Sequence, residues 1–229
     1  MLFHEERKFV FIAVPKTGTS AIEKHLSELD PAIRRDELPA EDGNWVRVTK
    51  HTPFHKVRAH LGAAAKDYSF IGFFRDPREL AVSKYNWYRN GWPYDRWKDG
   101  SLPLFYRNRN WWKPSLAHRV LAARSLPLSL WLRIYPFKPN AYFVLDSDGS
   151  IGLDLVGRFH DLQEDFIKIF SRFGYCASDL VLPRVNVVKY EDYDVNHILV
   201  NRIVQKRCRL DMGIADRMQL LSAAEPCLD

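Results

Sequence analysis

The chain has 229 residues, of which 46% are hydrophobic, and a formal charge of +6 from 34 Lys and Arg against 28 Asp and Glu. This composition excludes a disordered chain and is enough for one α/β domain with its own core. The basic excess favours anionic partners such as nucleotides, sulfated sugars, nucleic acid or anionic lipid, although a charge of this size is also ordinary for a solubilising surface.

The cysteine content and the hydropathy pattern bear on the compartment. Cys176, Cys208 and Cys227 show no CxxC spacing, which favours a reducing compartment over a disulfide framework or a zinc site. The apolar run near the N-terminus is too short for a signal-peptide core or a membrane span, and no later segment is long enough to span a bilayer. We therefore expect a soluble, cytoplasmic protein without a transmembrane segment.

The first half of the chain alternates strand and helix patterns. Phe9–Val14 is a continuous apolar run, typical of a buried parallel strand, and residues 19–29 have the apolar spacing of a helix. The next expected elements are a loop over 31–44, a strand over Trp45–Val48, a helix over Phe54–Ala64, a buried strand over Tyr68–Phe74 and a helix over about 77–90. This order predicts an α/β fold of three layers, with a parallel β-sheet and helices on both of its faces.

Residues 91–113 interrupt this pattern with glycine and proline, and they are crowded with aromatic and basic side chains. The later expected elements are helices over 115–134 with a break at Pro127, a strand over Ala141–Leu145, a turn at 148–149, and helices over 161–173 and 195–209. No domain boundary stands out, so we expect a single domain over 1–229.

The stretch AVPKTGTSAIEKHL at 13–26 has the layout of a phosphate-binding loop, because it follows an apolar run and opens into a helix. The free amides and the dipole at a helix N-terminus attract anions, and Gly18 allows a close approach of the backbone. The other polar groups of the loop belong to Lys16, Thr17, Thr19 and Ser20. The alternative is an ordinary Ser/Thr-rich helix cap.

A second anion site is expected after the second buried strand. Arg75 follows that strand, at the carboxyl end where open α/β sheets bind ligands, and Ser83 comes eight residues later. An Arg fork and a hydroxyl together suit a phosphate, although Arg-Asp-Pro is also a plain helix start. Combined with the first loop, this pair predicts a nucleotide with phosphates at both its 5′ and 3′ positions.

These motifs resemble those of the sulfotransferases, P-loop-like enzymes that use 3′-phosphoadenosine 5′-phosphosulfate (PAPS). PKTGTS at 15–20 resembles their 5′-phosphosulfate loop, and Arg75 with Ser83 resembles their 3′-phosphate site. TKHTPF at 49–54, GRFHDLQEDF at 157–166 and LPRVN at 182–186 resemble further blocks of the carbohydrate-type families. The chain departs from the family at His160, where Glu is frequent, and at Asp76, where Asn is frequent.

The resemblance implies transfer of a sulfuryl group from PAPS to an acceptor hydroxyl, on a glycan or glycolipid, without a metal ion. Lys16 and the loop amides would stabilise the leaving phosphate, and Lys50 would support the phosphosulfate. His51 would be the general base. His55 and His60 rank behind His51, and a carboxylate base is a further alternative.

The aromatic and basic segment at about 91–113 suggests a lid over the acceptor, since aromatic faces stack on sugar rings and Arg pairs with acidic groups. Simple packing is the alternative explanation for these aromatics, and single-stranded nucleic acid ranks second as a partner. Two other functions stay open. One is a P-loop kinase-like enzyme that uses ATP, and the other is a non-catalytic module that binds an anionic polymer.

Overall fold

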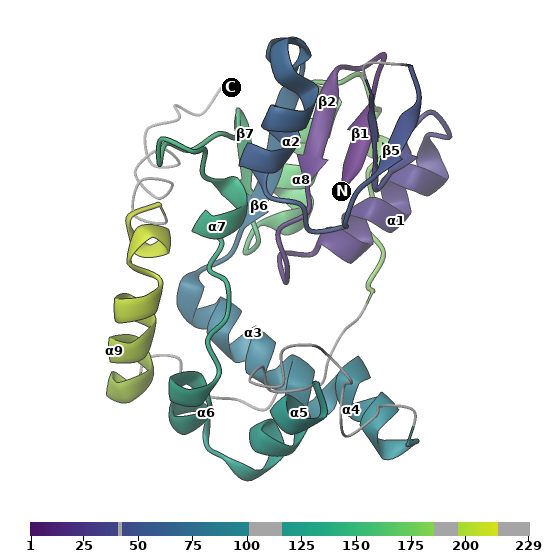
Figure 1. Ribbon diagram of the computed structural model, residues 1–229. Coiled ribbons are helices and arrows are strands. Elements are labelled where there is room, and N and C mark those ends of the chain that lie inside the picture. Colours follow the sequence, from purple (N-terminus) through teal and green to yellow (C-terminus); the bar gives the residue numbers. More distant parts are fainter. Residues whose placement is uncertain (41–42, 101–115, 186–196, 215–229) are drawn as a thin grey trace, which may run out of the picture. The chain divides into compact units, whose positions relative to one another are not determined.

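The computed structural model describes residues 1–40, 43–100, 116–185 and 197–214 (Figure 1). The chain divides into two compact units. The first comprises Met1–Asp76, Pro139–Asn186 and Gly213–Asp229, and the second comprises Pro77–Lys138 and Val187–Met212. Each unit thus combines segments that lie far apart in the sequence, and the expectation of one domain over 1–229 stays a prediction.

The first unit contains a five-stranded sheet. Its strands are β1 (Leu2–His4), β2 (Phe9–Ile12), β3 (Arg34–Arg35), β6 (Ser69–Phe74) and β7 (Leu155–Arg158). Their order across the sheet is β3-β1-β2-β6-β7. The pairs β2–β6 and β6–β7 are parallel, whereas β1 is antiparallel to both β2 and β3. The protein is therefore of the mixed α/β class, with a mixed sheet.

The two strands predicted from apolar runs are confirmed as β2 and β6, and they are neighbours in parallel register. The sheet as a whole is mixed because β1, which the apolar pattern does not indicate, forms a hairpin with β2. The connection between β1 and β2 is four residues long, and a connection this short permits only antiparallel pairing. Strand β7 is also missing from the sequence prediction.

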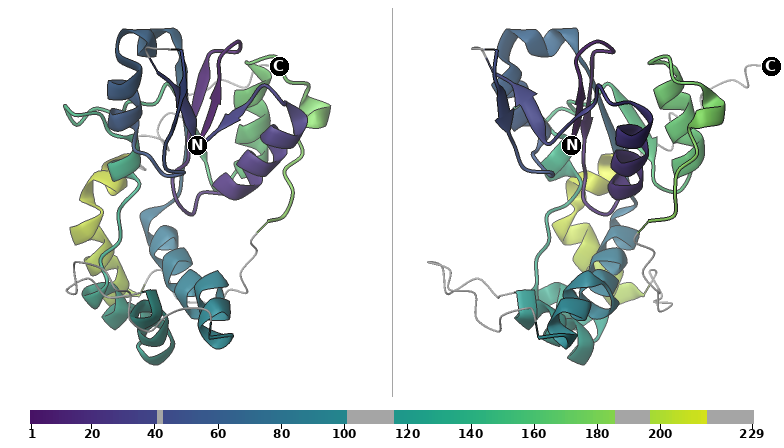
Figure 2. Two further views of the ribbon diagram at one scale, coloured as in Figure 1. Left: turned by 45° about the vertical axis from the view of Figure 1, so that its right-hand side comes forward. Right: turned by 90° about the vertical axis from the view of Figure 1, so that its right-hand side faces the viewer.

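Side chains on one face of the sheet pack against α1 (Thr19–Leu29) and α8 (Leu162–Ser171). Phe9 and Phe11 are fully buried there, and both rings lie against Phe170 of α8, with centroid distances of 5.6 and 6.4 Å. The views of Figure 2 place α1 and α8 on the same face of the sheet. The helix predicted over 19–29 is confirmed with the same bounds.

Side chains on the opposite face pack against α2 (Phe54–Leu61) and α7 (Ala141–Val144). Val10 and Ile12 alternate with the phenylalanines of β2 and belong to this second core, together with Phe143. The predicted helix from Phe54 is therefore present as α2.

The remaining elements of the first unit are the 3₁₀ helices η1 (Gly62–Asp67) and η2 (Ala177–Asp179), and a two-stranded sheet of β4 (Glu37–Pro39) and β5 (Trp45–Arg47). The predicted strand near Trp45 is confirmed as β5. Part of the expected loop over 31–44 is extended, because β3 and β4 lie within it.

The strand predicted over Ala141–Leu145 is wrong, because residues 141–144 form the single helical turn α7. The continuous apolar run AYFVL at 141–145 is typical of a buried strand, but β7 occupies the place beside β6 in the sheet. Leu145 makes only an isolated bridge to Ile151, across the turn predicted at 148–149. That turn is confirmed, with Gly149 at φ 84°.

The described part of the second unit contains helices and short loops, and no strand. Its helices are α3 (Pro77–Asn90), α4 (Trp92–Lys98), α5 (Leu116–Ser125), α6 (Leu128–Ile134) and α9 (Ile198–Arg207). The helix predicted over 77–90 is confirmed as α3, and the break at Pro127 separates α5 from α6 as expected. Helix α9 lies within the range predicted over 195–209, whose first two residues are outside the described part of the chain.

Two aromatic residues of α3 that precede the predicted lid, Tyr85 and Tyr88, pack within this helical unit. Tyr85 is 1% exposed, and its hydroxyl donates to the Leu126 carbonyl at 2.6 Å. Its ring and that of Tyr88 each lie 5.5 Å from the ring of Trp131. Packing therefore accounts for these two aromatics. The part of the predicted lid from 101 to 113 lies outside the described residues.

Candidate functional site

The parallel part of the sheet brings three chain segments to one edge. In this register Ile12 lies opposite Gly72, and Phe74 lies opposite Arg158, so β2, β6 and β7 end on the same side. Lys16 follows β2, and Arg75 follows β6 directly. The carboxyl edge of parallel strands is where open α/β sheets bind their ligands.

The loop between β2 and α1 is a tight turn with two left-handed residues, Lys16 at φ 71° and Gly18 at φ 79°. The hydroxyl of Thr17 donates to the Val14 carbonyl at 2.9 Å and closes the turn. Such a conformation is costly for a lysine, and strained residues of this kind cluster at ligand sites. The proton of the Thr17 hydroxyl therefore forms a hydrogen bond within the loop.

The N-terminus of α1 presents backbone amides at the end of this loop. Gly18 is the N-cap, and its carbonyl accepts the first helical hydrogen bonds, from the amides of Ala21 at 2.9 Å and Ile22 at 3.3 Å. The amides of Thr19 and Ser20 lie in the first turn, where the helix offers them no carbonyl. These amides and the positive end of the helix dipole favour a bound anion.

Arg75 is held against this loop and is only 9% exposed. Its Nη1 donates to the Lys16 carbonyl at 3.2 Å, and its guanidinium lies 3.9 Å from the centroid of the Phe159 ring. The Arg75 carbonyl accepts from Asn140 Nδ2 at 2.8 Å, and the Phe159 amide donates to the Phe74 carbonyl at 2.8 Å. The guanidinium thus contacts two segments, and a third segment binds the backbone of Arg75.

Two cations lie close together at this edge. Burial lowers the pKa of Lys16 to about 8, and the charge of Arg75 acts in the same direction. A negatively charged ligand would relieve both effects, because it would restore the favourable interactions that the ammonium loses on leaving water.

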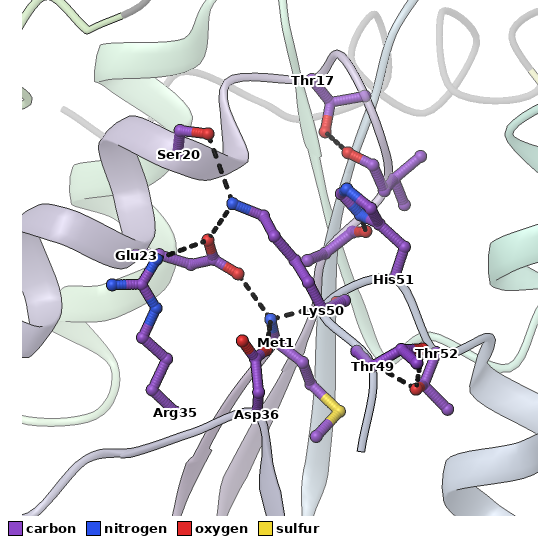
Figure 3. Close-up of polar contacts among 12 residues, drawn as sticks. Met1, Thr17, Ser20, Glu23, Arg35, Asp36, Thr49, Lys50, His51 and Thr52 are labelled. Atoms are coloured by element: carbon purple, nitrogen blue, oxygen red, sulfur yellow. Dashed lines mark hydrogen bonds and ion pairs between the residues drawn. The ribbon is translucent and has the colours of Figure 1, made fainter. Parts of the chain in front are cut away.

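Lys50 and His51 approach the same loop from the segment before α2 (Figure 3). The two neighbouring side chains point in different directions. Lys50 Nζ donates to Ser20 Oγ at 3.3 Å and forms an ion pair with Glu23 on α1. His51 Nδ1 lies 2.6 Å from the carbonyl of Ala13, just after β2.

The contact with Ala13 determines the tautomer of His51. A carbonyl oxygen only accepts, so Nδ1 carries the proton and Nε2 keeps its lone pair in the neutral ring. Burial lowers the pKa of His51, the bond to Ala13 opposes this, and the charge of Lys50 lowers it further, with a net decrease. A neutral imidazole with a basic Nε2 is the form that a general base requires.

The first unit brings together nearly all of the predicted site residues. These are Lys16, Thr17, Gly18, Thr19, Ser20, Lys50, His51 and Arg75. Ser83 belongs to the second unit, where it is 1% exposed on α3, and its pairing with Arg75 stays a prediction.

The lower-ranked histidines make other contacts. The His55 ring packs edge-on against Tyr142, with centroids 6.4 Å apart, and His60 Nε2 lies 3.0 Å from the Pro39 carbonyl.

Sequence reasoning missed Glu23, Phe159 and the ion pair of Arg158 with Asp165. The Arg158 guanidinium makes two parallel 3.0 Å bonds to the Asp165 carboxylate, which ties the end of β7 to α8. The sequence could have predicted that Glu23 is buried, because positions 19, 22, 23 and 26 share one face of the helix and belong to the buried side of α1.

Comparison of the chain with protein-family models, with curated proteins and with solved structures finds no match. Within the described residues, no group of three or more His, Cys, Asp or Glu side chains is placed to hold a metal ion. In the same part of the chain, no helix has both the length and the apolar character needed to cross a membrane.

We predict that Gly18→Ala destabilises the protein more than Gly149→Ala does. Both glycines have a positive φ, of 79° and 84°, which costs an alanine about 1–2 kcal/mol. An added Cβ at Gly18 would also lie 2.5 Å from Leu162 Cδ2, whereas nothing lies within 4 Å at Gly149. Urea unfolding should show a further loss of about 0.5–1.5 kcal/mol for Gly18→Ala, the cost of moving the end of the Leu162 side chain off its rotamer. Equal losses would contradict this, and Leu162→Ala should recover part of the difference.

We predict that His51 titrates below the ordinary histidine value, with the proton of its neutral form on Nδ1. Long-range ¹H–¹⁵N NMR across a pH series reports both properties. Because the pKa is lowered on folding, the stability from neutral His51 is complete above the unfolded pKa and is lost as pH falls through the folded pKa. A pKa at or above the ordinary value, or a proton on Nε2, would contradict the assignment.

Proposed function

We propose that this chain is a PAPS-dependent sulfotransferase that transfers a sulfuryl group to a hydroxyl of a glycan or glycolipid. The observation that carries the proposal is the placement of Lys16 and Arg75 at the carboxyl edge of two adjacent parallel strands. Arg75 Nη1 donates to the Lys16 carbonyl at 3.2 Å, and burial beside Arg75 lowers the pKa of Lys16 to about 8. Two cations held together at a helix N-terminus favour a strongly anionic ligand.

The residues of the loop fit the 5′-phosphosulfate end of such a donor. The amides of Thr19 and Ser20 would bind its oxygens, and Lys16 would neutralise the bridging oxygen as charge develops on it. Lys50, held 3.3 Å from Ser20 Oγ, would add a second cation to the same group. We also propose that the 3′-phosphate binds to Arg75 and Ser83.

The finer fold assignment belongs to the same proposal. Helices α1 and α8 pack on one face of the sheet and α2 and α7 on the other, which supports a three-layer arrangement. The β2–loop–α1 unit supports a P-loop-like architecture, to which the antiparallel strands β1 and β3 add an edge.

The proposed reaction is an in-line displacement at sulfur. The acceptor oxygen forms a bond to sulfur while the bond from sulfur to the 5′-phosphate oxygen breaks. Nε2 of His51 takes the proton of the acceptor hydroxyl, and the electron pair of the broken bond goes to the phosphate. Adenosine 3′,5′-bisphosphate leaves, with its new charge stabilised by Lys16 and the loop amides.

Calorimetric titration tests the donor class. We expect the full chain to bind adenosine 3′,5′-bisphosphate more tightly than ADP or ATP with Mg²⁺. Lys16→Met should weaken binding roughly 10- to 150-fold, as expected for a lost hydrogen bond to a charged group. The control Lys24→Met removes the same charge from an exposed position of α1 and should have little effect. Affinity should fall as pH rises through about 8, because Lys16 then loses its proton, and this dependence should vanish in Lys16→Met.

Preference for ATP would favour the kinase-like alternative, and absence of binding to every nucleotide would favour a polymer-binding module. Either result would refute the donor assignment.

Substitution of His51 tests the base. His51→Ala should leave bisphosphate affinity within about twofold and reduce turnover by roughly 10²–10⁴-fold, the usual contribution of a general base. Turnover is measured with radiolabelled PAPS and a set of acceptor glycans. His55→Ala is the matched control and should retain activity. Substantial turnover in His51→Ala would show that another group is the base.

A further inference from the structure

Glu23 is a buried acid one turn along α1 from the anion-binding loop. Its side chain is fully buried, three residues after Ser20 and beside Ile22 and Leu26 on the buried side of the helix. Burying a carboxylate is costly unless cations compensate it. A negative charge this close to the proposed site would also repel a bound anion, so its presence requires an explanation.

Cations from three parts of the chain surround this carboxylate (Figure 3). Lys50 Nζ forms an ion pair with Oε2, Arg35 Nη2 lies 3.8 Å from the same oxygen, and the Met1 amine lies 2.5 Å from Oε1. Burial raises the pKa of Glu23, but the Met1 ammonium and Lys50 together outweigh burial and hold it below its ordinary value. The carboxylate is therefore ionised at neutral pH.

The ion pair with Glu23 determines where the Lys50 ammonium lies. The side chain of Lys50 is 30% exposed, and a lysine at such a position loses rotamer freedom when it is held in one place. Here its Nζ contacts both Glu23 on α1 and the hydroxyl of Ser20 in the first turn of that helix. The ammonium thus lies at the first turn of α1, whose amides would bind a phosphate or phosphosulfate.

We propose that Glu23 is a positioning residue that holds Lys50 Nζ beside Ser20, ready to receive the anion of the donor. This role rests on the proposed function, since it concerns the same loop. The ordering of Lys50 occurs on folding, so a ligand does not bear that entropic cost when it binds. The favourable placement of the cation outweighs the repulsion between Glu23 and the ligand.

The two effects of Glu23 have opposite signs, which makes the proposal testable. Removal of the charge alone would tighten anion binding, because a nearby repulsion disappears. Loss of positioning would weaken binding, but only while Lys50 is present. Glu23→Gln therefore separates a positioning residue from a carboxylate that serves only the fold.

The experiment is a double-mutant cycle on adenosine 3′,5′-bisphosphate affinity, measured by calorimetry with the full chain. The four proteins are the wild type, Glu23→Gln, Lys50→Met and the double variant. We expect Glu23→Gln to weaken binding roughly 5- to 30-fold, a coupling typical of one ion-pair network. In the Lys50→Met background the same change should leave affinity unchanged or tighten it.

Two further variants control for folding and net charge. Glu28→Gln removes the same charge from an exposed position of α1, next to Lys24 at 4.0 Å, and should leave binding unchanged. Glu23→Asp keeps the charge but retracts the carboxylate, and it should weaken binding by a smaller factor than Glu23→Gln. If Glu23→Gln does not give a cooperative thermal transition, the affinity of Glu23→Asp is used to test the positioning role instead.

The outcomes separate the two proposals. Suppose that the wild type binds the bisphosphate and that Glu23→Gln binds it equally or more tightly. The positioning role is then overturned and the proposed function stands. The same conclusion follows from Glu23→Asp where Glu23→Gln does not fold. An equal loss with and without Lys50 would show that Glu23 does not act through that residue, which also overturns the role. If the wild type does not bind the bisphosphate, the proposed function fails and the role of Glu23 fails with it.

Discussion

The parallel pairing of β2 with β6 is the interaction on which the candidate site depends. Parallel strands that are neighbours end at the same edge, so the residues after β2 and β6 meet although they lie far apart in the sequence. Gly72 lies opposite Ile12 in this register, and an added Cβ there would lie 2.6 Å from Leu153 Cδ1. Lys16 and Arg75 are close because they follow two adjacent parallel strands that end at the same edge of the sheet.

The site gathers charges that are costly to bury, and its residues compensate them in two different ways. Glu23 is compensated within the protein, by Lys50 and by the Met1 amine. Burial and the charge of Arg75 both lower the pKa of Lys16. In the proposed function a bound phosphate would oppose both effects, because its negative charge would favour the charged form of Lys16.

Local patterns were sufficient for most helices and for the two central strands, because an apolar run or a helical stripe is visible within about ten residues. They failed at Ala141–Leu145, where competition with β7 for the place beside β6 decides the conformation. They indicate that Glu23 lies on the buried side of α1, but they do not identify its partners, which come from distant segments. Neither competition between segments nor contact across the fold is encoded in a short window of sequence.

The sequence by itself determined the loop chemistry, since the order of Lys16, Gly18 and the hydroxyl residues before a helical stripe already describes an anion-binding turn. It also determined that Arg75 follows a buried strand. Only the tertiary structure decided that Arg75 lies against Lys16, that His51 has its lone pair on Nε2, and that Lys50 is held by Glu23. Each of these depends on distances between segments that only the packed sheet and its helices bring together.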